Sequence, residues 1–201
     1  MESNKKNKYP KTAENVYQFK ITLKEIKPPI WRRIIVPDYY SFWDLSVAIQ
    51  CSMGWIGDHL HEFVINSPGT KIKAHLGIPD ENEDEDEQDI SAGWKYKIKD
   101  FFTLENNTAN YIYDFGDYWQ HTVMLEKIIP AGKGVVYPVC IAGKRACPPE
   151  DCGGTYGYEE IINGASEFQE EYNDYDPEYF NADDIYFEDP DESLRFLKMQ
   201  Q

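Results

Sequence analysis

The chain has 201 residues, of which 36 are acidic and 20 are basic, and its formal net charge is −16. Hydrophobic residues make up 41% of the chain and aromatic residues 15%, which is too much for a wholly disordered acidic protein. The longest mostly apolar run, residues 135–142, contains Pro138 and is far shorter than the roughly 20 residues that a membrane helix needs.

The chain begins with a polar, lysine-rich stretch, residues 1–15, which we expect to be a flexible tail. No apolar segment follows its lysines, so it predicts no secretory signal, and we expect a cytoplasmic protein. Residues 17–24 alternate between apolar and polar side chains, which predicts a strand with one solvent-facing side. After two prolines, residues 30–36 predict a second strand and therefore a hairpin.

The clearest helix is predicted over residues 42–53. Ser41 and Asp44 have the spacing of a capping box, and apolar residues recur every three or four positions. Gly54 can then end the helix in the left-handed conformation. The patterns that follow predict strands at 60–65, 94–98, 111–115 and 119–129, a helical turn at 100–104, a helix at 155–162, and a last helix after Asp189.

The negative charge is concentrated in two segments. Residues 80–89 contain eight acidic side chains and residues 167–192 contain twelve, and neither segment has a base. Without these twenty acids the formal net charge changes from −16 to +4, so the body of the protein is mildly basic. We expect residues 78–92 to form an acidic, mobile loop, and residues 167–192 to form an ordered acidic arm, because aromatic side chains lie between the acids of the arm.

Strands outnumber helices in this pattern and do not alternate strictly with them, which favours an α+β fold over a doubly wound parallel sheet. We therefore expect one domain over residues 16–201, with the acidic loop inserted. Its sheet is expected to be mixed or antiparallel and to open with the order strand, strand, helix, strand. A few short helices and a C-terminal helix complete the predicted domain.

Four segments carry a resemblance to a known family: PPIWRR at 28–33, GW and HLHEF within 54–63, YDFGDYWQH at 113–121, and CIAGKRACPPEDCGGTYGY at 140–158. In this order they resemble the plasmid pRiA4b ORF-3-like family of bacteria and archaea, over roughly residues 16–198. The resemblance implies a compact α+β domain and no established activity. Some members carry a resolvase label, but neither the serine beside an arginine cluster nor the helix-turn-helix of a serine recombinase is recognisable here.

Three histidines are candidate metal ligands. His59 and His61 are two residues apart on a predicted strand, so their side chains would share a face and present two imidazoles to one ion. His121, on another predicted strand, could supply a third nitrogen. The alternative is that all three are structural polar groups beside aromatic residues. Candidate oxygen donors or partners for such an ion are Asp58, Asp114 and Asp117.

The late cysteines Cys140, Cys147 and Cys152 are spaced C-x6-C-x4-C, without the C-x2-C pair that is typical of zinc sites. Together with His121 they could still hold zinc. A bridge between the second and third is also conceivable, although a cytosolic chain is usually reduced. The remaining alternative is that they are buried free thiols, as we expect for Cys51.

Residues 144–154 combine prolines, which restrict the backbone, with glycines, which allow unusual backbone angles. A rigid loop that also carries charges is typical of a functional surface, so we treat it as a candidate binding loop. The alternative is a structural clasp whose carboxylates pair with arginines or backbone N–H groups. The candidate binding residues are Lys144, Arg145, Glu150, Asp151, Gly153 and Gly154.

The sequence contains no phosphate-binding G-x-x-x-x-G-K-[ST] loop, no G-x-G-x-x-G and no G-x-S-x-G elbow. Its many Tyr and Trp residues suit an interface, so the leading hypothesis is a non-enzymatic binding module for an unknown protein or small ligand. The first alternative is a metal-dependent hydrolase or nuclease-like enzyme with Asp117 or Glu150 as general base. The second is a nucleic-acid-associated protein with an autoinhibitory acidic loop, which the net charge of −16 disfavours.

Overall fold

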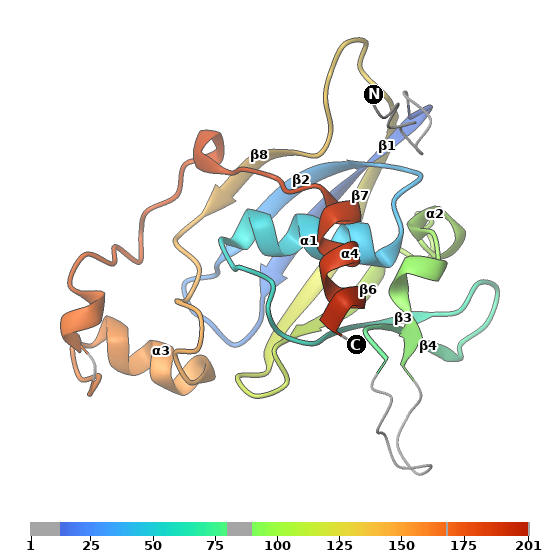
Figure 1. Cartoon of the computed structure of the whole chain (residues 1–201). Helices are drawn as coiled ribbons and strands as arrows, with labels where there is room; N and C mark the ends of the chain where they lie inside the picture. The colour runs from blue at the N-terminus through green and yellow to red at the C-terminus, as the bar shows by residue number, and fades with distance from the viewer. Residues whose placement is uncertain (1–12, 80–89, 168, 201) are drawn as a thin grey trace, which may run out of the picture.

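The structure, a computed structural model, describes residues 13–79, 90–167 and 169–200 (Figure 1). Within these residues, one eight-stranded sheet is accompanied by four α-helices, which confirms the predicted α+β fold. No helix in this part of the chain is long and apolar enough to span a membrane. The predicted tail at 1–15 and acidic loop at 78–92 lie largely outside the described residues.

The sheet has the strand order β5-β4-β3-β6-β7-β1-β2-β8. All neighbours are antiparallel except β4 and β5, so the sheet is mixed. The strands are β1 (Asn15–Leu23), β2 (Trp31–Pro37), β3 (His61–Asn66), β4 (Lys73–Gly77), β5 (Ser91–Ala92), β6 (Thr108–Tyr113), β7 (Trp119–Pro130) and β8 (Val139–Lys144).

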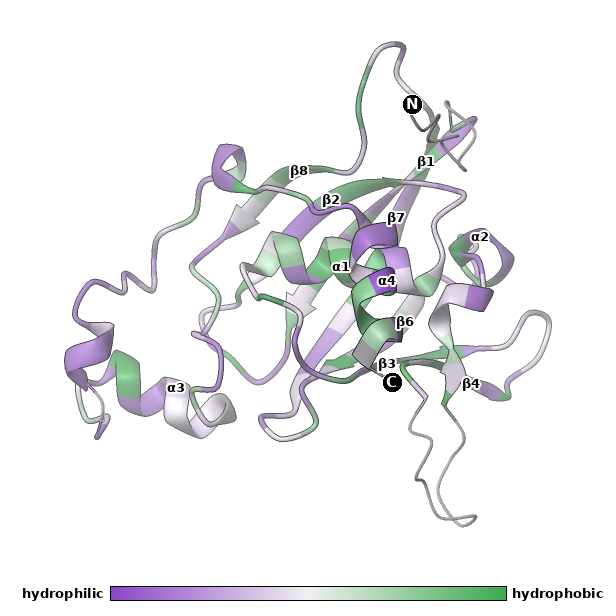
Figure 2. Cartoon of the chain, viewed as in Figure 1, coloured by the Kyte–Doolittle hydropathy of each residue, from purple (hydrophilic) through white to green (hydrophobic). Residues whose placement is uncertain are grey.

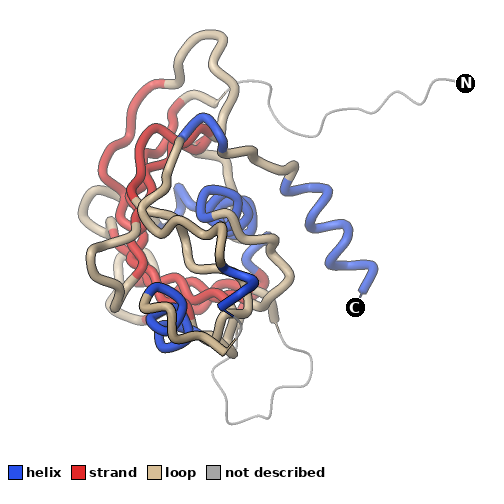
Figure 3. Tube along the Cα trace, turned by 90° about the vertical axis from the view of Figure 1, so that its left-hand side faces the viewer, coloured by secondary structure: helices blue, strands red, loops and turns tan. Residues whose placement is uncertain are grey.

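Helices α1 (Phe42–Met53) and α4 (Pro190–Gln200) lie on the same side of the sheet. Figure 3 shows α1 next to the strands and α4 beyond α1, and Leu194 and Leu197 of α4 pack against Trp43 and Val47 of α1. In Figure 2 green and purple stretches alternate along β2, and β8 is largely green, whereas the acidic arm is mostly purple. The helices are α1 (Phe42–Met53), α2 (Ile98–Phe101), α3 (Gly154–Ile162) and α4 (Pro190–Gln200), with 3-10 turns at Gly93–Lys95, Gln169–Tyr172 and Ala182–Asp184.

The first elements follow the sequence patterns closely. β1 and β2 form the predicted antiparallel hairpin, in which Phe19 lies opposite Ile34 and both are fully buried. The predicted capping box of α1 is confirmed, because the Asp44 N–H donates to Ser41 Oγ and the Ser41 N–H donates to the Asp44 carboxylate. Gly54 ends the helix with a φ of 99°, which favours glycine.

The strand predicted at 94–98 is wrong. Gly93–Lys95 is a 3-10 turn and Ile98 already begins α2, where it and Phe101 face the core three residues apart. Three strands, β4, β5 and β8, were not predicted. The described ends of the acidic loop are ordered, since Ile78 is buried and Ser91–Ala92 forms β5.

The acidic arm is fastened to the body by two buried arginines. Arg145 donates to the Glu178 carboxylate at 2.7 Å and to the Pro28 carbonyl at 2.6 Å. The guanidinium of Arg32 lies 4.4 Å from the centre of the Phe180 ring, which also covers Gly143 so closely that a Cβ there would lie 2.4 Å from it. The prediction of an ordered arm over these residues is therefore confirmed.

His61 and His121 are buried in the core. The ring of His61 packs against Trp43 and Tyr111, and neither of its nitrogens has a hydrogen-bond partner among the described residues. Burial lowers the pKa of His61 to about 3 and that of His121 to about 4, so both are neutral in the folded protein near pH 7.

The buried His61 predicts acid sensitivity. Between pH 6.5 and about 3, the unfolded chain takes up a proton that the folded chain does not, so stability is present above this window and is lost as the pH falls through it. Between pH 7.5 and pH 5 we expect the free energy of unfolding of the His61→Phe variant to fall by about 2 kcal/mol less than that of the wild type. Urea unfolding at the two pH values measures the difference. An unchanged pH dependence would contradict a neutral, unpaired His61.

Candidate functional site

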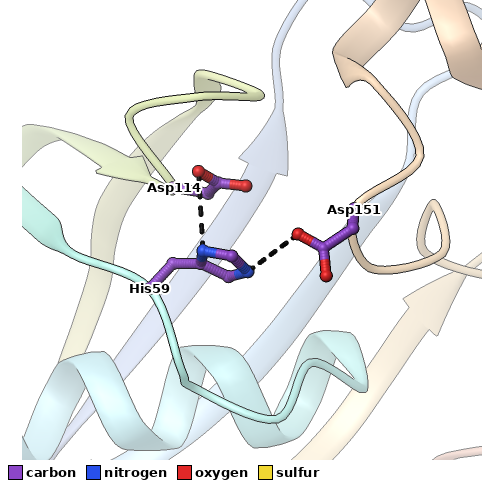
Figure 4. A group of neighbouring side chains, drawn as sticks. All are labelled: His59, Asp114 and Asp151. Atoms are coloured by element: carbon purple, nitrogen blue, oxygen red, sulfur yellow. Dashed lines mark ion pairs between the residues drawn. The ribbon is translucent and has the colours of Figure 1, made fainter.

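His59 lies between α1 and β3, with one carboxylate facing each ring nitrogen (Figure 4). Its Nδ1 is 3.7 Å from Asp114 Oδ1, and its Nε2 is 3.1 Å from Asp151 Oδ1. One ligand atom from each of the three residues lies within 4.8 Å of the other two. In the described part of the chain, this is the only group of three or more His, Cys, Asp or Glu side chains placed to hold a metal ion.

Asp114 is positioned by the turn between β6 and β7. It has a φ of 56°, a left-handed conformation that Asp adopts more readily than most residues. Its Oδ1 accepts the Gly116 N–H at 2.8 Å, and its carbonyl accepts the Tyr118 N–H at 2.7 Å. The Asp114 N–H donates to the Leu60 carbonyl at 2.9 Å, which brings the segment that carries His59 alongside.

Asp151 is positioned by the predicted binding loop. The indole of Trp55 donates to the Pro148 carbonyl at 3.0 Å and stacks on Tyr113, with 4.8 Å between ring centroids. At the other end of the loop, the Gly153 N–H donates to the Asp117 carboxylate at 3.1 Å. A Cβ on Gly154 would lie 2.7 Å from the Asp117 carbonyl, so this close approach of two loops requires glycine.

Glu150 adds a third carboxylate. Its Oε1 accepts the Tyr113 hydroxyl and lies 3.8 Å from His59 Nε2. Its Oε2 is buried without a hydrogen-bond partner in the described structure. Burial raises the pKa of the Glu150 carboxyl, and the Tyr113 hydroxyl offsets part of that effect. The site therefore contains one imidazole and three acids from three separate segments.

A cavity of about 660 Å³ opens beside this group. Its walls come from α1, from residues 55–60 and from the stretch 188–197, which includes most of α4. His59 lines the cavity, and 29% of its side chain is exposed. Asp151 is 72% exposed, whereas Asp114 is 11% exposed, so the group is anchored on one side and open to solvent on the other.

The other predicted ligands do not join this group. His61 and His121 lie in the core, and the cysteines are free thiols. Burial raises the pKa of the Cys147 thiol, and burial together with Asp117 raises that of Cys152 to about 12, so both are protonated near neutral pH.

The binding-loop residues divide between two roles. Arg145 is buried and fastens the arm, whereas Lys144 is exposed at the end of β8. Glu150 and Asp151 reach His59. Asp117 supports the loop rather than facing His59, and the aromatic pair of Trp55 and Tyr113 that holds the loop had not been predicted as part of the site.

Comparisons with known proteins agree with the predicted resemblance. The family model described as plasmid pRiA4b ORF-3-like protein matches residues 15–189. The uncharacterized protein y4hQ of Sinorhizobium fredii is 31% identical over 156 residues, which cover 76% of this chain and 74% of that protein. The crystal structure of the protein of unknown function MM3350 from Methanosarcina mazei Go1 is 47% identical, with a TM-score of 0.79 over 89% of this chain and 100% of that one.

The hydrogen bond from Trp55 to Pro148 predicts how the loop is held. We expect Trp55→Phe to keep the stacking on Tyr113, to lose about 1 kcal/mol of stability, and to raise hydrogen exchange in residues 148–153. Hydrogen exchange with mass spectrometry measures the effect. Trp94→Phe is the control, since it changes an indole outside the loop contacts and should leave exchange in residues 148–153 unchanged.

Proposed function

The chain belongs to the plasmid pRiA4b ORF-3-like family, and because the relatives described above are named without an activity, we propose a function from the site itself. The protein is a binding module that holds a divalent metal ion at His59, Asp114 and Asp151. The observation that supports it is the approach of one imidazole and two carboxylates from three separate segments. Histidine nitrogen and carboxylate oxygen together suit zinc and manganese.

The spacing of the donor atoms fits such an ion. Zinc ligands lie about 2.1 Å from the metal, which places tetrahedral neighbours about 3.4 Å apart. His59 Nε2 lies 3.1 Å from Asp151 Oδ1, and one donor atom from each of His59, Asp114 and Asp151 lies within 4.8 Å of the other two. Because Asp151 is exposed, a coordination position on its side is left for an external ligand.

The site is also held in place without an ion. Asp114 is fixed by its turn and by the bond to Leu60, and the loop that carries Asp151 is fixed at Pro148 and Gly153. Preformed donors do not have to be ordered when the ligand binds, which favours affinity. The nucleic-acid alternative depends on residues 80–89, which lie outside the described residues and give it no support.

Zinc binding tests the proposal directly. With protein stripped by EDTA, we expect calorimetry to give one zinc ion per chain, and Asp114→Asn and His59→Gln each to weaken zinc affinity by about tenfold or more. Asparagine keeps the turn bond of Asp114 and removes only its charge. His61→Phe is the matched control and should bind zinc like the wild type. Zinc that persists in both test variants but is lost in Cys152→Ser would place the ion at the thiols and refute the proposal.

A metal-dependent hydrolase is the second candidate, favoured by the position of Glu150. Its carboxylate is anchored by Tyr113, and its Oε1 lies 3.8 Å from His59 Nε2, beside the proposed ion, where a general base would take a proton from water.

The hydrolase candidate predicts a separation of binding from turnover. Zinc-loaded wild type should hydrolyse bis(p-nitrophenyl) phosphate, and Glu150→Gln should lower kcat by about 100-fold with zinc affinity changed less than about threefold. Zinc binding without turnover in the wild type would leave the binding module as the function.

A further inference from the structure

The cavity beside His59 is rich in aromatic rings and hydrogen-bond acceptors, and we propose that it binds a small organic cation, an amine or ammonium group carried on an apolar body. The proposal goes beyond metal binding and does not depend on it, because only His59 belongs both to the cavity lining and to the group with Asp114 and Asp151.

The lining has one sign of charge. Among the described residues that line the cavity, three are acids, Asp58, Glu188 and Glu192, and none is a lysine or an arginine. Glu192 forms an exposed ion pair with Arg195 at 3.4 Å, which partly neutralises its charge. Asp58 and Glu188 are therefore expected to attract a cation more strongly. A cavity with low-dielectric walls and one sign of charge concentrates ligands of the opposite sign.

The hydrogen-bond donors of the lining are already used. The Trp43 indole N–H donates to the Pro190 carbonyl at 2.9 Å, and the Trp55 indole N–H donates to the Pro148 carbonyl. The Ser193 hydroxyl donates within its own turn, to Glu188 and to the Asp189 carbonyl. The lining therefore offers carboxylate oxygens and few free donors, which suits a ligand that is itself a donor.

The apolar part of the lining selects an organic cation over a bare ion. Indole rings attract cations to their faces, and the chain already does this where Lys198 of α4 lies 5.1 Å over Trp94. The volume of about 660 Å³ is that of a small-molecule site. The apolar side chains that accompany the two indoles in the lining are Val47, Ile56, Leu60, Ile78, Phe196 and Leu197.

Three probes of the same shape separate charge from apolar burial: 3-phenylpropylamine, 3-phenylpropan-1-ol and 3-phenylpropanoate, titrated with EDTA present. Fluorescence of the lining indoles reports binding. We expect the amine to bind about tenfold more tightly than the alcohol, and the alcohol more tightly than the anion. The amine should also slow alkylation of Cys51, which lines the cavity, and leave that of Cys140 unchanged.

Charge variants locate the attraction. Asp58→Asn and Glu188→Gln, both at exposed positions, should each weaken the amine about threefold and leave the alcohol unchanged, whereas Glu171→Gln on the arm should change neither. Equal affinity for amine and alcohol, no amine binding up to 10 mM, or the same loss in Glu171→Gln would overturn the proposal. The amine titrations contain EDTA, and zinc binding is measured in a separate experiment with His59→Gln. Either proposal can therefore fail while the other stands.

Discussion

Two of the three segments that form the site are anchored by one buried charge, the guanidinium of Arg32, which is 2% exposed. It donates to the Ser52 carbonyl at 2.7 Å, at the C-terminal end of α1, where helix carbonyls lack partners and the helix dipole is negative. It also donates to the Lys144 carbonyl at the end of β8. α1 has no basic residue in its own last turn, so Arg32 supplies the positive charge from the sheet.

A buried cation without a carboxylate is expensive unless its N–H groups are satisfied. Here carbonyls of three residues and the face of Phe180 fill that role, and burial lowers the pKa of Arg32. The end of α1 continues directly to Gly54 and His59, and the end of β8 continues directly to the loop with Asp151. Two of the three segments of the candidate site therefore begin at groups that bond to the same side chain.

The elements predicted correctly from the sequence are those in which apolar and polar side chains alternate, or apolar side chains recur at helical spacing, within the segment itself. β1 and β2 alternate between apolar and polar side chains over most of their length, and the large apolar residues of α1 recur every three or four positions, although 11 of its 12 residues are buried. β8 is an edge strand with no buried residue, and it is held by pairing with β2 and covered in part by the arm, neither of which leaves a local signal. Residues 94–98 alternate as a strand would, but Tyr96 packs on Phe101 and the chain turns.

The sequence indicates which residues are candidates for the site, but it does not show which of them lie together in the fold. His59, Asp114, Glu150 and Asp151 all carry sequence signals, yet His59 was paired with His61 on the assumption that one strand holds both. β3 begins only at His61, whose side chain enters the core, while His59 precedes the strand and turns to the carboxylates. Asp114 and Asp151 both have a positive φ, at turns near glycines, and only tertiary contacts bring these turns together.

The uneven charge of the chain has a structural consequence at the cavity. The acidic arm is held against the mildly basic body by Arg32 and Arg145, and two of its last four acids, Glu188 and Glu192, line the cavity beside His59. The arm thus brings negative charge to a place where the group around His59 already contributes acids. Carboxylates that share a small region repel one another, and a bound cation relieves that repulsion. The same argument applies to a metal ion at His59 and to an amine in the cavity, which is why both proposals expect positively charged ligands.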